Sequence, residues 1–163
     1  MGEHLLYNPV IRPATADDVV AILAVMGGVY REYGFIFDPE YEAPDLVRFY
    51  ETYDQESGAF FVSMIDGKIS GTIGIKFIEA TVTEIVRLYL DADFRGGGIG
   101  QRLLKTAISW AQNRKCDKVS LWSDTRFTQA HKLYAKTGFV KGTMRHLTDV
   151  NKSVEYQFTL DLA

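Results

Sequence analysis

The chain has 163 residues, of which 47% are hydrophobic and 24% are charged, and its formal net charge at pH 7 is −3. These values are ordinary for a globular protein, and the length suits a single domain over residues 1–163. The sequence has no run of about 20 apolar residues and no signal-peptide pattern, so we expect no membrane partner. Cys116 is the one cysteine in the sequence, which excludes an internal disulfide and favours a cytoplasmic location. The acidic charge balance argues against nucleic acid as a partner.

The first third of the sequence predicts one strand and then helical segments. We expect a short strand at 10–12, followed by a helix that is capped by Thr15 and has apolar residues at helical spacing up to Met26. An aromatic and acidic stretch at 30–44 has no clear period. A short helix is expected at 45–53. The Gly27–Gly28 pair should weaken or end the first helix.

The remaining two thirds alternate strands with amphipathic helices. We expect strands at 59–65, 68–78, 82–90, 118–122, 139–146 and 154–162, and helices at 98–113 and 128–136. Asp66-Gly67 predicts a hairpin turn, and Gly138 suits the end of the second helix. Strands interspersed with helices predict an α/β or α+β fold.

A glycine-rich loop, RGGGIG from Arg95 to Gly100, separates the strand at 82–90 from the helix that follows. Glycine lets backbone N–H groups approach an anion, and a helix N-terminus adds a positive dipole end, so this arrangement is typical of phosphate binding. The dinucleotide and P-loop patterns both fail, because Gln101 stands where they require glycine or lysine. The alternative is a connection that only caps the helix. Six basic residues and one acidic residue in 95–118 favour a ligand with several phosphates.

Two stretches stand out as motifs, residues 84–100 with the sequence EIVRLYLDADFRGGGIG and residues 130–139 with the sequence AHKLYAKTGF. They resemble the acetyl-CoA motif and the downstream A-x-x-L-Y-x-x-x-G-F motif of the GNAT superfamily of acetyl-CoA-dependent N-acetyltransferases. The motifs occur in the family's order, and the resemblance is strong over residues 60–140. Phe127 is a departure, since many members carry asparagine there to contact CoA.

The resemblance implies a GNAT-like fold and a donor site. The implied fold is a mixed α/β (α+β) sheet of six to seven strands, splayed between strands 4 and 5 and flanked by about four helices. The implied cosubstrate is acetyl-CoA, with its pyrophosphate at the loop, its pantetheine arm paired with the backbone of 88–90, and the Leu88 N–H donating to the thioester carbonyl. The residues expected to bind it are Leu88, Tyr89, Leu90, Arg95, Gly96, Gly97, Gly98, Ile99, Gly100, Gln101 and Tyr134.

Two residues are candidates for proton transfer. Tyr134 matches the motif tyrosine, which in the family lies near the CoA sulfur as a general acid; its alternative role is a buried packing aromatic. Glu84 is the candidate base, because its alternation partners Val86, Leu88 and Leu90 are apolar. A carboxylate on an apolar strand face lies either at the solvated end of the strand or at a functional site. A solvated strand-end glutamate or a base acting through water molecules are the alternatives.

The acceptor is an amine that the sequence does not name. Residues 30–56 hold eight acidic and two basic residues, which favours a cationic amine. Phe60, Phe61 and residues 30–42 are expected to shape the acceptor pocket, with Asp149, Asn151 and Glu155 as further candidates on that side.

Other readings stay open at this point. A domain of the same fold could bind acyl-CoA without catalysis, as a sensor or assembly module, and a different phosphate ligand is a third alternative. The family resemblance makes a homodimer an expectation. His4 and His146 have no partners at metal-ligand spacing, and His131 reads as a surface or cap-region histidine, so we expect no metal.

Overall fold

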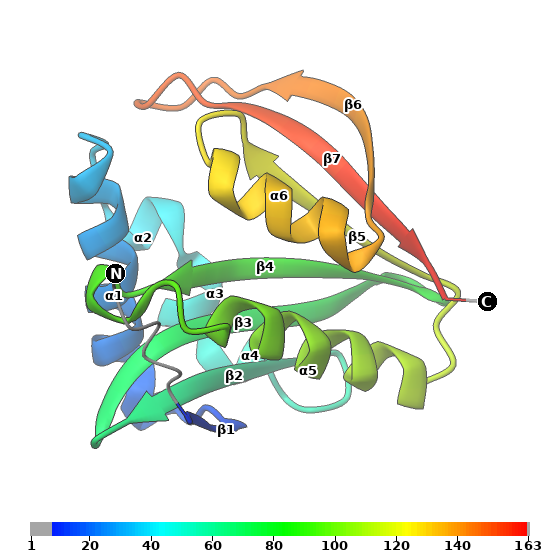
Figure 1. Cartoon of the computed structure of the whole chain (residues 1–163), viewed down its shortest axis with the longest axis horizontal. Coiled ribbons are helices and arrows are strands. Elements are labelled where there is room, and N and C mark those ends of the chain that lie inside the picture. The colour runs from blue at the N-terminus through cyan, green and yellow to red at the C-terminus, as the bar shows by residue number, and fades with distance from the viewer. Residues whose placement is uncertain (1–7, 163) are drawn as a thin grey trace, which may run out of the picture.

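A computed structural model describes residues 8–162 of the chain (Figure 1). The strands are β1 (Val10–Pro13), β2 (Gly58–Ile65), β3 (Lys68–Glu79), β4 (Val82–Leu90), β5 (Lys118–Asp124), β6 (Val140–His146) and β7 (Val154–Asp161). The α-helices are α1 (Val19–Glu32), α2 (Pro39–Glu42), α3 (Pro44–Val47), α4 (Phe49–Thr52), α5 (Ile99–Asn113) and α6 (Thr128–Thr137), and short 3₁₀ turns cover Ala16–Asp18 and Ala92–Phe94. None of these helices is long and apolar enough to cross a membrane.

The described strands form one mixed sheet in the order β1-β2-β3-β4-β5-β7-β6. Strands β1 to β4 are antiparallel neighbours, β4 and β5 are parallel, and β5, β7 and β6 are again antiparallel. The expected mixed sheet of six to seven strands is therefore confirmed, with seven strands and, in place of about four helices, six in the described part of the chain.

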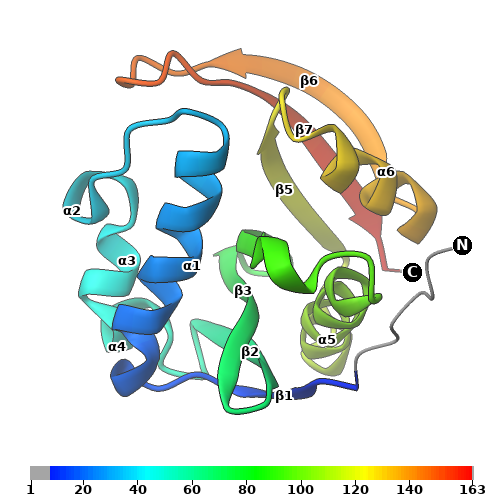
Figure 2. The same ribbon diagram turned by 60° about the vertical axis from the view of Figure 1, so that its left-hand side comes forward.

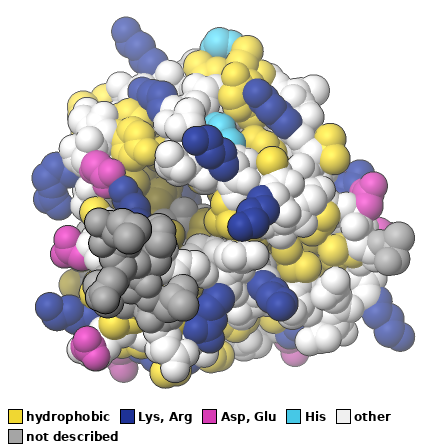
Figure 3. Space-filling view, viewed as in Figure 1, with side chains coloured by type: hydrophobic (Ala, Val, Ile, Leu, Met, Phe, Trp, Pro, Cys, Tyr) yellow, Lys and Arg dark blue, Asp and Glu magenta, His cyan; other side chains and the backbone are white. Residues whose placement is uncertain are grey.

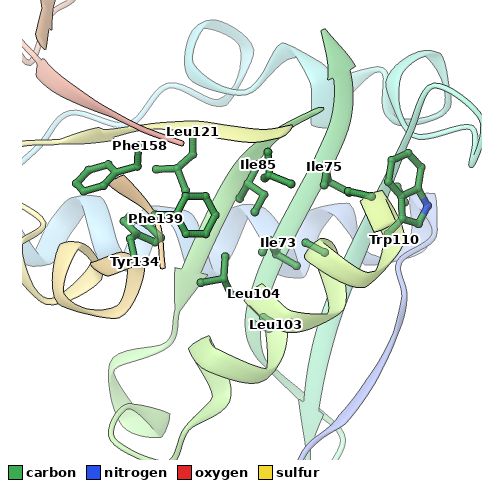
Figure 4. Close-up of a cluster of buried hydrophobic side chains, with 14 of the residues drawn as sticks. Ile73, Ile75, Ile85, Leu103, Leu104, Trp110, Leu121, Tyr134, Phe139 and Phe158 are labelled. Atoms are coloured by element: carbon green, nitrogen blue, oxygen red, sulfur yellow. The ribbon is translucent and has the colours of Figure 1, made fainter. Parts of the chain in front are cut away.

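The helices cover the two faces of the sheet separately. Figure 2 shows α1 to α4 on one side of the sheet and α5 on the other, with α6 beside the strands β5 and β7. On the α5 side, Leu103 and Leu104 are completely buried and point toward the isoleucines of β3 and β4 (Figure 4). On the α1 side, Ile22 and Met26 pack with side chains of β2. The alternation of apolar residues along the strands thus supplies two cores, one for each face.

Helix α1 continues through the Gly27–Gly28 pair, which was expected to weaken or end it, and ends at Glu32. The next turn buries Val29 and Tyr30, so tertiary packing outweighs the low helix propensity of glycine. A Cβ at position 27 would lie 3.2 Å from the Phe37 ring, which shows that the missing side chain lets this ring approach the helix.

The short helix expected at 45–53 is instead two separate turns, α3 and α4. Arg48 between them has φ −111° and ψ 58°, which is not a helical conformation. The break lets Leu46 in one turn and Phe49 in the next both reach the α1-side core. Tyr53 is buried as well, whereas Tyr50 is 60% exposed. The sequence did not predict the interruption.

Candidate active site

The strands β4 and β5 separate halfway along their length. Their parallel register runs from Val82 opposite Lys118 to Ile85 opposite Leu121 and ends there. Both strands continue, β4 to Leu90 and β5 to Asp124, held by β3 and β7 on their outer sides. The expected splay between the fourth and fifth strands is confirmed, and it leaves backbone on both strands facing a gap.

A β-bulge at Arg87 lies beside this gap. Tyr89 is opposite Thr72 and Val86 is opposite Gly74, so two residues of β4 face one residue of β3. Arg87 has a left-handed φ of 57°, and its carbonyl accepts a 2.8 Å hydrogen bond from the Thr72 hydroxyl.

The bulge reverses the alternation of β4. Leu88 and Leu90 pack with the α5-side core, as Ile85 does, whereas Val86 and Tyr89 pack with the α1-side core. The expectation that Glu84, Val86, Leu88 and Leu90 share one face is therefore wrong. The extra residue shifts Leu88 and Leu90 to the opposite face from Val86.

A first cavity of about 420 Å³ occupies the gap. In Figure 3 a hollow with hydrophobic side chains inside and Lys and Arg side chains around it opens between α6 and the segment before α5. Of the residues expected to bind the cosubstrate, the cavity is lined by Leu88, Tyr89, Leu90, Arg95, Gly96, Gly100 and Tyr134. Gly97, Gly98, Ile99 and Gln101 do not line it. Ile99 is instead a core residue, and Gln101 is exposed on α5.

The loop glycines have different structural roles. Gly98 is the N-cap of α5 with φ 79°, a conformation that residues with a Cβ rarely adopt, and open space surrounds the position. A Cβ on Gly100 would lie 3.2 Å from Leu133 and 3.3 Å from Leu90. Both glycines were expected to contribute to cosubstrate binding. At Gly100, close packing of α5 against α6 and β4 accounts for the glycine.

Arg95 connects the loop to two other elements. Its guanidinium donates to Glu32 Oε2 at 2.6 Å, at the end of α1, and to the Leu90 carbonyl at 3.1 Å. Arg95 is one of the basic residues in 95–118 whose charge was expected to favour a ligand with several phosphates. In the structure much of that charge is balanced by Glu32.

Tyr134 is buried in α6 and lines the first cavity. Burial raises the pKa of its phenol, and an interaction with the Ser123 side chain acts in the opposite direction. The phenol therefore keeps its proton at neutral pH.

Ser123 also contacts His131, whose Nε2 lies 3.1 Å from the Ser123 hydroxyl. His131 is half-buried against Phe158, at 5.1 Å between ring centroids, so it is not the surface histidine expected from the sequence. Sequence reasoning missed Ser123 because it ended β5 at Trp122, whereas the strand continues to Asp124.

A second cavity of about 310 Å³ adjoins the first. Both cavities share the lining residues Ile85, Val86, Arg87, Tyr89, Trp122, Asp124, Phe127 and Glu155. Glu84 lines only the second cavity and Tyr134 only the first, so the two candidate catalytic residues lie on different sides of the shared wall. Phe127 stacks edge-on against Tyr33 at 4.8 Å, which puts an aromatic wall where many family members carry asparagine.

Residues from two segments that are distant in the sequence line the second cavity. Tyr30, Phe35 and Glu42 come from the aromatic and acidic stretch, and Asp149, Asn151 and Glu155 come from the terminal hairpin. Phe60 and Phe61, which were also expected to shape the acceptor pocket, line neither cavity. Strand alternation points Phe60 into the α1-side core, and Phe61 packs against the α5-side core.

An ion pair supports the wall between the cavities. Arg87, in the bulge, donates to the Asp45 carboxylate at 2.8 and 3.3 Å, and the Tyr53 hydroxyl donates to it at 2.6 Å. Burial alone would raise the pKa of Asp45, but the hydrogen bonds and charge of Arg87 outweigh it and hold the pKa below its usual value. The pair therefore fixes the bulge to α3.

Comparison with known proteins agrees with this geometry. The acetyltransferase (GNAT) family model matches residues 26–139, more than half of the chain, and the chain belongs to this family. The chain is 31% identical to the uncharacterized N-acetyltransferase MJ1207 of Methanocaldococcus jannaschii, covering 87% of this chain and 67% of that protein. It is 29% identical to the uncharacterized N-acetyltransferase YjgM of Escherichia coli, and the match covers 81% of this chain and 82% of that protein.

Solved structures share the fold. One is yncA, a putative acetyltransferase from Salmonella typhimurium solved with its cofactor acetyl-CoA, which matches with a TM-score of 0.76 and 16% identity over 96% of this chain and 95% of that chain. At this identity the likeness shows the fold alone.

Replacing Asp45 should destabilise the protein in a pH-dependent way. At pH 7 we expect Asp45→Asn to lower the free energy of unfolding by about 3 kcal/mol, because Arg87 stays buried without its charged partner. The pKa of Asp45 is lower in the folded state, so its contribution is present above the unfolded value of about 3.9 and is lost as pH falls through the folded value. Urea unfolding of both proteins should show the difference shrinking below about pH 4.

Asp66→Asn is the matched control, since it makes the same change in an exposed turn. If Asp45→Asn lowers the free energy of unfolding at pH 7 by no more than Asp66→Asn does, the ion pair does not support the fold.

Proposed function

We propose that the protein transfers the acetyl group of acetyl-CoA to a primary amine of a small molecule or peptide, by direct attack in a ternary complex. The observation that carries the proposal is the first cavity, which connects a glycine loop at a helix N-terminus to a buried tyrosine across the β4–β5 gap. Membership of the acetyltransferase family supports the same reaction.

The donor site is built from backbone. N–H groups of residues 95–100 would hold the pyrophosphate, aided by the positive end of the α5 dipole. The pantetheine amides would pair with β4 from Leu88 to Leu90, beyond the point where the β4–β5 register ends. Leu88 has no register partner on either neighbouring strand in the described sheet, and we assign its N–H to the thioester carbonyl oxygen.

The chemical step needs two proton transfers. The lone pair of the neutral amine attacks the thioester carbon, the C–S bond breaks, and Tyr134 donates a proton to the departing sulfur. The new nitrogen centre loses its proton to Glu84, directly or through water. Because burial raises the pKa of the Tyr134 phenol, the phenol is protonated and available as a donor when the C–S bond breaks.

The function is tested by following thiol release from acetyl-CoA over a panel of amines and short peptides. We expect acetyl-CoA to raise the melting temperature and at least one acceptor to release CoA above the solvent background. Cys116 is buried, so the thiol reagent should report CoA with little protein signal. Stabilisation without thiol release from any acceptor would favour a non-catalytic acyl-CoA-binding module, and no stabilisation would favour another ligand.

Tyr134→Phe removes one hydroxyl and should separate binding from catalysis. We expect kcat to fall by about a hundredfold, with the acetyl-CoA dissociation constant changed less than about threefold. Tyr156→Phe is the control, since Tyr156 lies in β7 and lines neither cavity. Steady-state kinetics and calorimetry check both values, and unchanged turnover in Tyr134→Phe would remove this residue from the mechanism.

Gly98→Ala should weaken donor binding through the backbone. A Cβ in the left-handed conformation costs about 1–2 kcal/mol, and relaxing it would turn the N–H groups of the loop away from their positions. We expect about a tenfold higher dissociation constant for acetyl-CoA by calorimetry. Gly28→Ala, at an equally open position with ordinary helical backbone, should leave binding unchanged. Equal binding by both variants would show that the loop conformation does not hold the ligand.

A further inference from the structure

The second cavity extends beyond the wall that it shares with the first. Its far part is lined by Glu42 of α2 and by Leu147, Asp149 and Ser153 near the β6–β7 turn, none of which lines the first cavity. A volume of about 310 Å³ is in the range of small-molecule sites.

Four of the eight charged residues that line this cavity are in ion pairs, and the other four, Glu42, Lys76, Glu84 and Asp149, form none among the described residues. Arg87 pairs with Asp45, Arg145 with Glu155, and Arg126 with Asp124. In the described part of the chain, Glu42 and Asp149 form no ion pair, although Asp149 accepts hydrogen bonds from the backbone and hydroxyl of Ser153. The lining therefore holds five acidic residues and three basic ones, and Glu42 and Asp149 are acidic residues without a cation at ion-pair distance in the described part of the chain.

Glu42 has a carboxylate oxygen that needs a partner. Its Oε2 accepts a long hydrogen bond of 3.4 Å from the Tyr30 hydroxyl. Its Oε1 is fully buried and has no hydrogen-bond partner among the described residues. Burial, and then the charge of Asp149, raise the pKa of Glu42. Two acidic groups close together in a partly buried site are costly, and a positively charged group in the cavity would offset the repulsion between Glu42 and Asp149.

Building on the acetyltransferase function proposed above, we propose that Glu42 and Asp149 bind a cationic group of the acceptor that is remote from the acetylated nitrogen. The attacking amine must be uncharged and must reach the shared wall beside the first cavity. Glu42 and Asp149 line only the second cavity, so the charge that they bind belongs to another group of the same molecule. The acceptor class is therefore a small amine with a second positive charge.

A bridge between two loops beside the cavity favours a small acceptor. Asn151 accepts a hydrogen bond from the Ile36 N–H at 2.8 Å and donates to the Ile36 carbonyl at 2.9 Å. This joins the segment after α1 to the β6–β7 turn. Arg126 adds to the same junction by stacking on Phe35 at 4.0 Å. The main chain of these two joined segments thus borders the cavity on the side of the terminal hairpin, which favours a small molecule over a peptide as the acceptor.

The test compares amines of one length that differ only at the far end. With saturating acetyl-CoA, wild-type kcat/KM for 1,4-diaminobutane should exceed that for 1-aminobutane and 4-amino-1-butanol by about tenfold. Glu42→Gln should lower the value for the diamine about tenfold, mainly through KM, and leave that for 1-aminobutane within about twofold. Glu40→Gln is the matched control, because it makes the same change at an exposed position of α2 that lines neither cavity.

A binding measurement keeps this test independent of turnover. Calorimetric titration of 1,4-diaminobutane into the protein with CoA should give a dissociation constant about tenfold higher in Glu42→Gln than in Glu40→Gln. No binding to wild type, equal binding by both variants, or equal kcat/KM for diamine and monoamine overturns the inference. Absence of thiol release with every amine, while the diamine binds through Glu42, counts against the acetyltransferase function alone.

Discussion

The early end of the β4–β5 ladder is the constraint on which the candidate site depends. The two strands pair only as far as Ile85 and Leu121, yet each remains held by its other neighbour for its full length. A sheet that parts in this way exposes main chain inside the protein without unravelling its edges. Both cavities meet at this opening, so the glycine loop, Tyr134 and the acidic far end all face one region because the strands diverge there.

Ion pairs connect this opening to elements that come from elsewhere in the chain. Arg87 ties the bulged part of β4 to α3 through Asp45, and Arg95 ties the glycine loop to the end of α1 through Glu32. The same helix α1 leads into the segment that Asn151 joins to the terminal hairpin. The donor side and the proposed acceptor side therefore share one helix, which couples their positions.

Much of the donor side could be predicted from the sequence, because it is built from consecutive residues. The strand 82–90, the loop and the helix after it form one continuous segment, and periodicity with glycine spacing is sufficient to place them. The splay followed from the family resemblance. The placement of Ser123 failed for a local reason, since β5 was ended two residues early.

The acceptor side could not be predicted in the same way. Glu42, Asp124 and Asp149 come together only through tertiary contacts between distant segments, and no spacing pattern links them. Phe60 and Phe61 were predicted to shape the acceptor pocket because they are aromatic, but their side chains pack in the two hydrophobic cores of the sheet. The bulge could not be predicted from the sequence either, because the residue with the left-handed conformation is Arg87 and not glycine or asparagine, which adopt that conformation more often.

Because of the bulge, a change in the number of residues in β4 should disturb the fold far more than a change in its apolar side chains. Many apolar side chains would serve at Leu88 or Leu90, since each fills space in a core. Loss of one residue from the bulge would restore regular alternation, and every side chain after it would turn to the other face of the sheet. Leu88 and Leu90 would then face α1, and Tyr89 would face α5. Apolar substitutions at Leu88 and Leu90 should therefore disturb the fold less than the insertion or deletion of one residue in this part of β4.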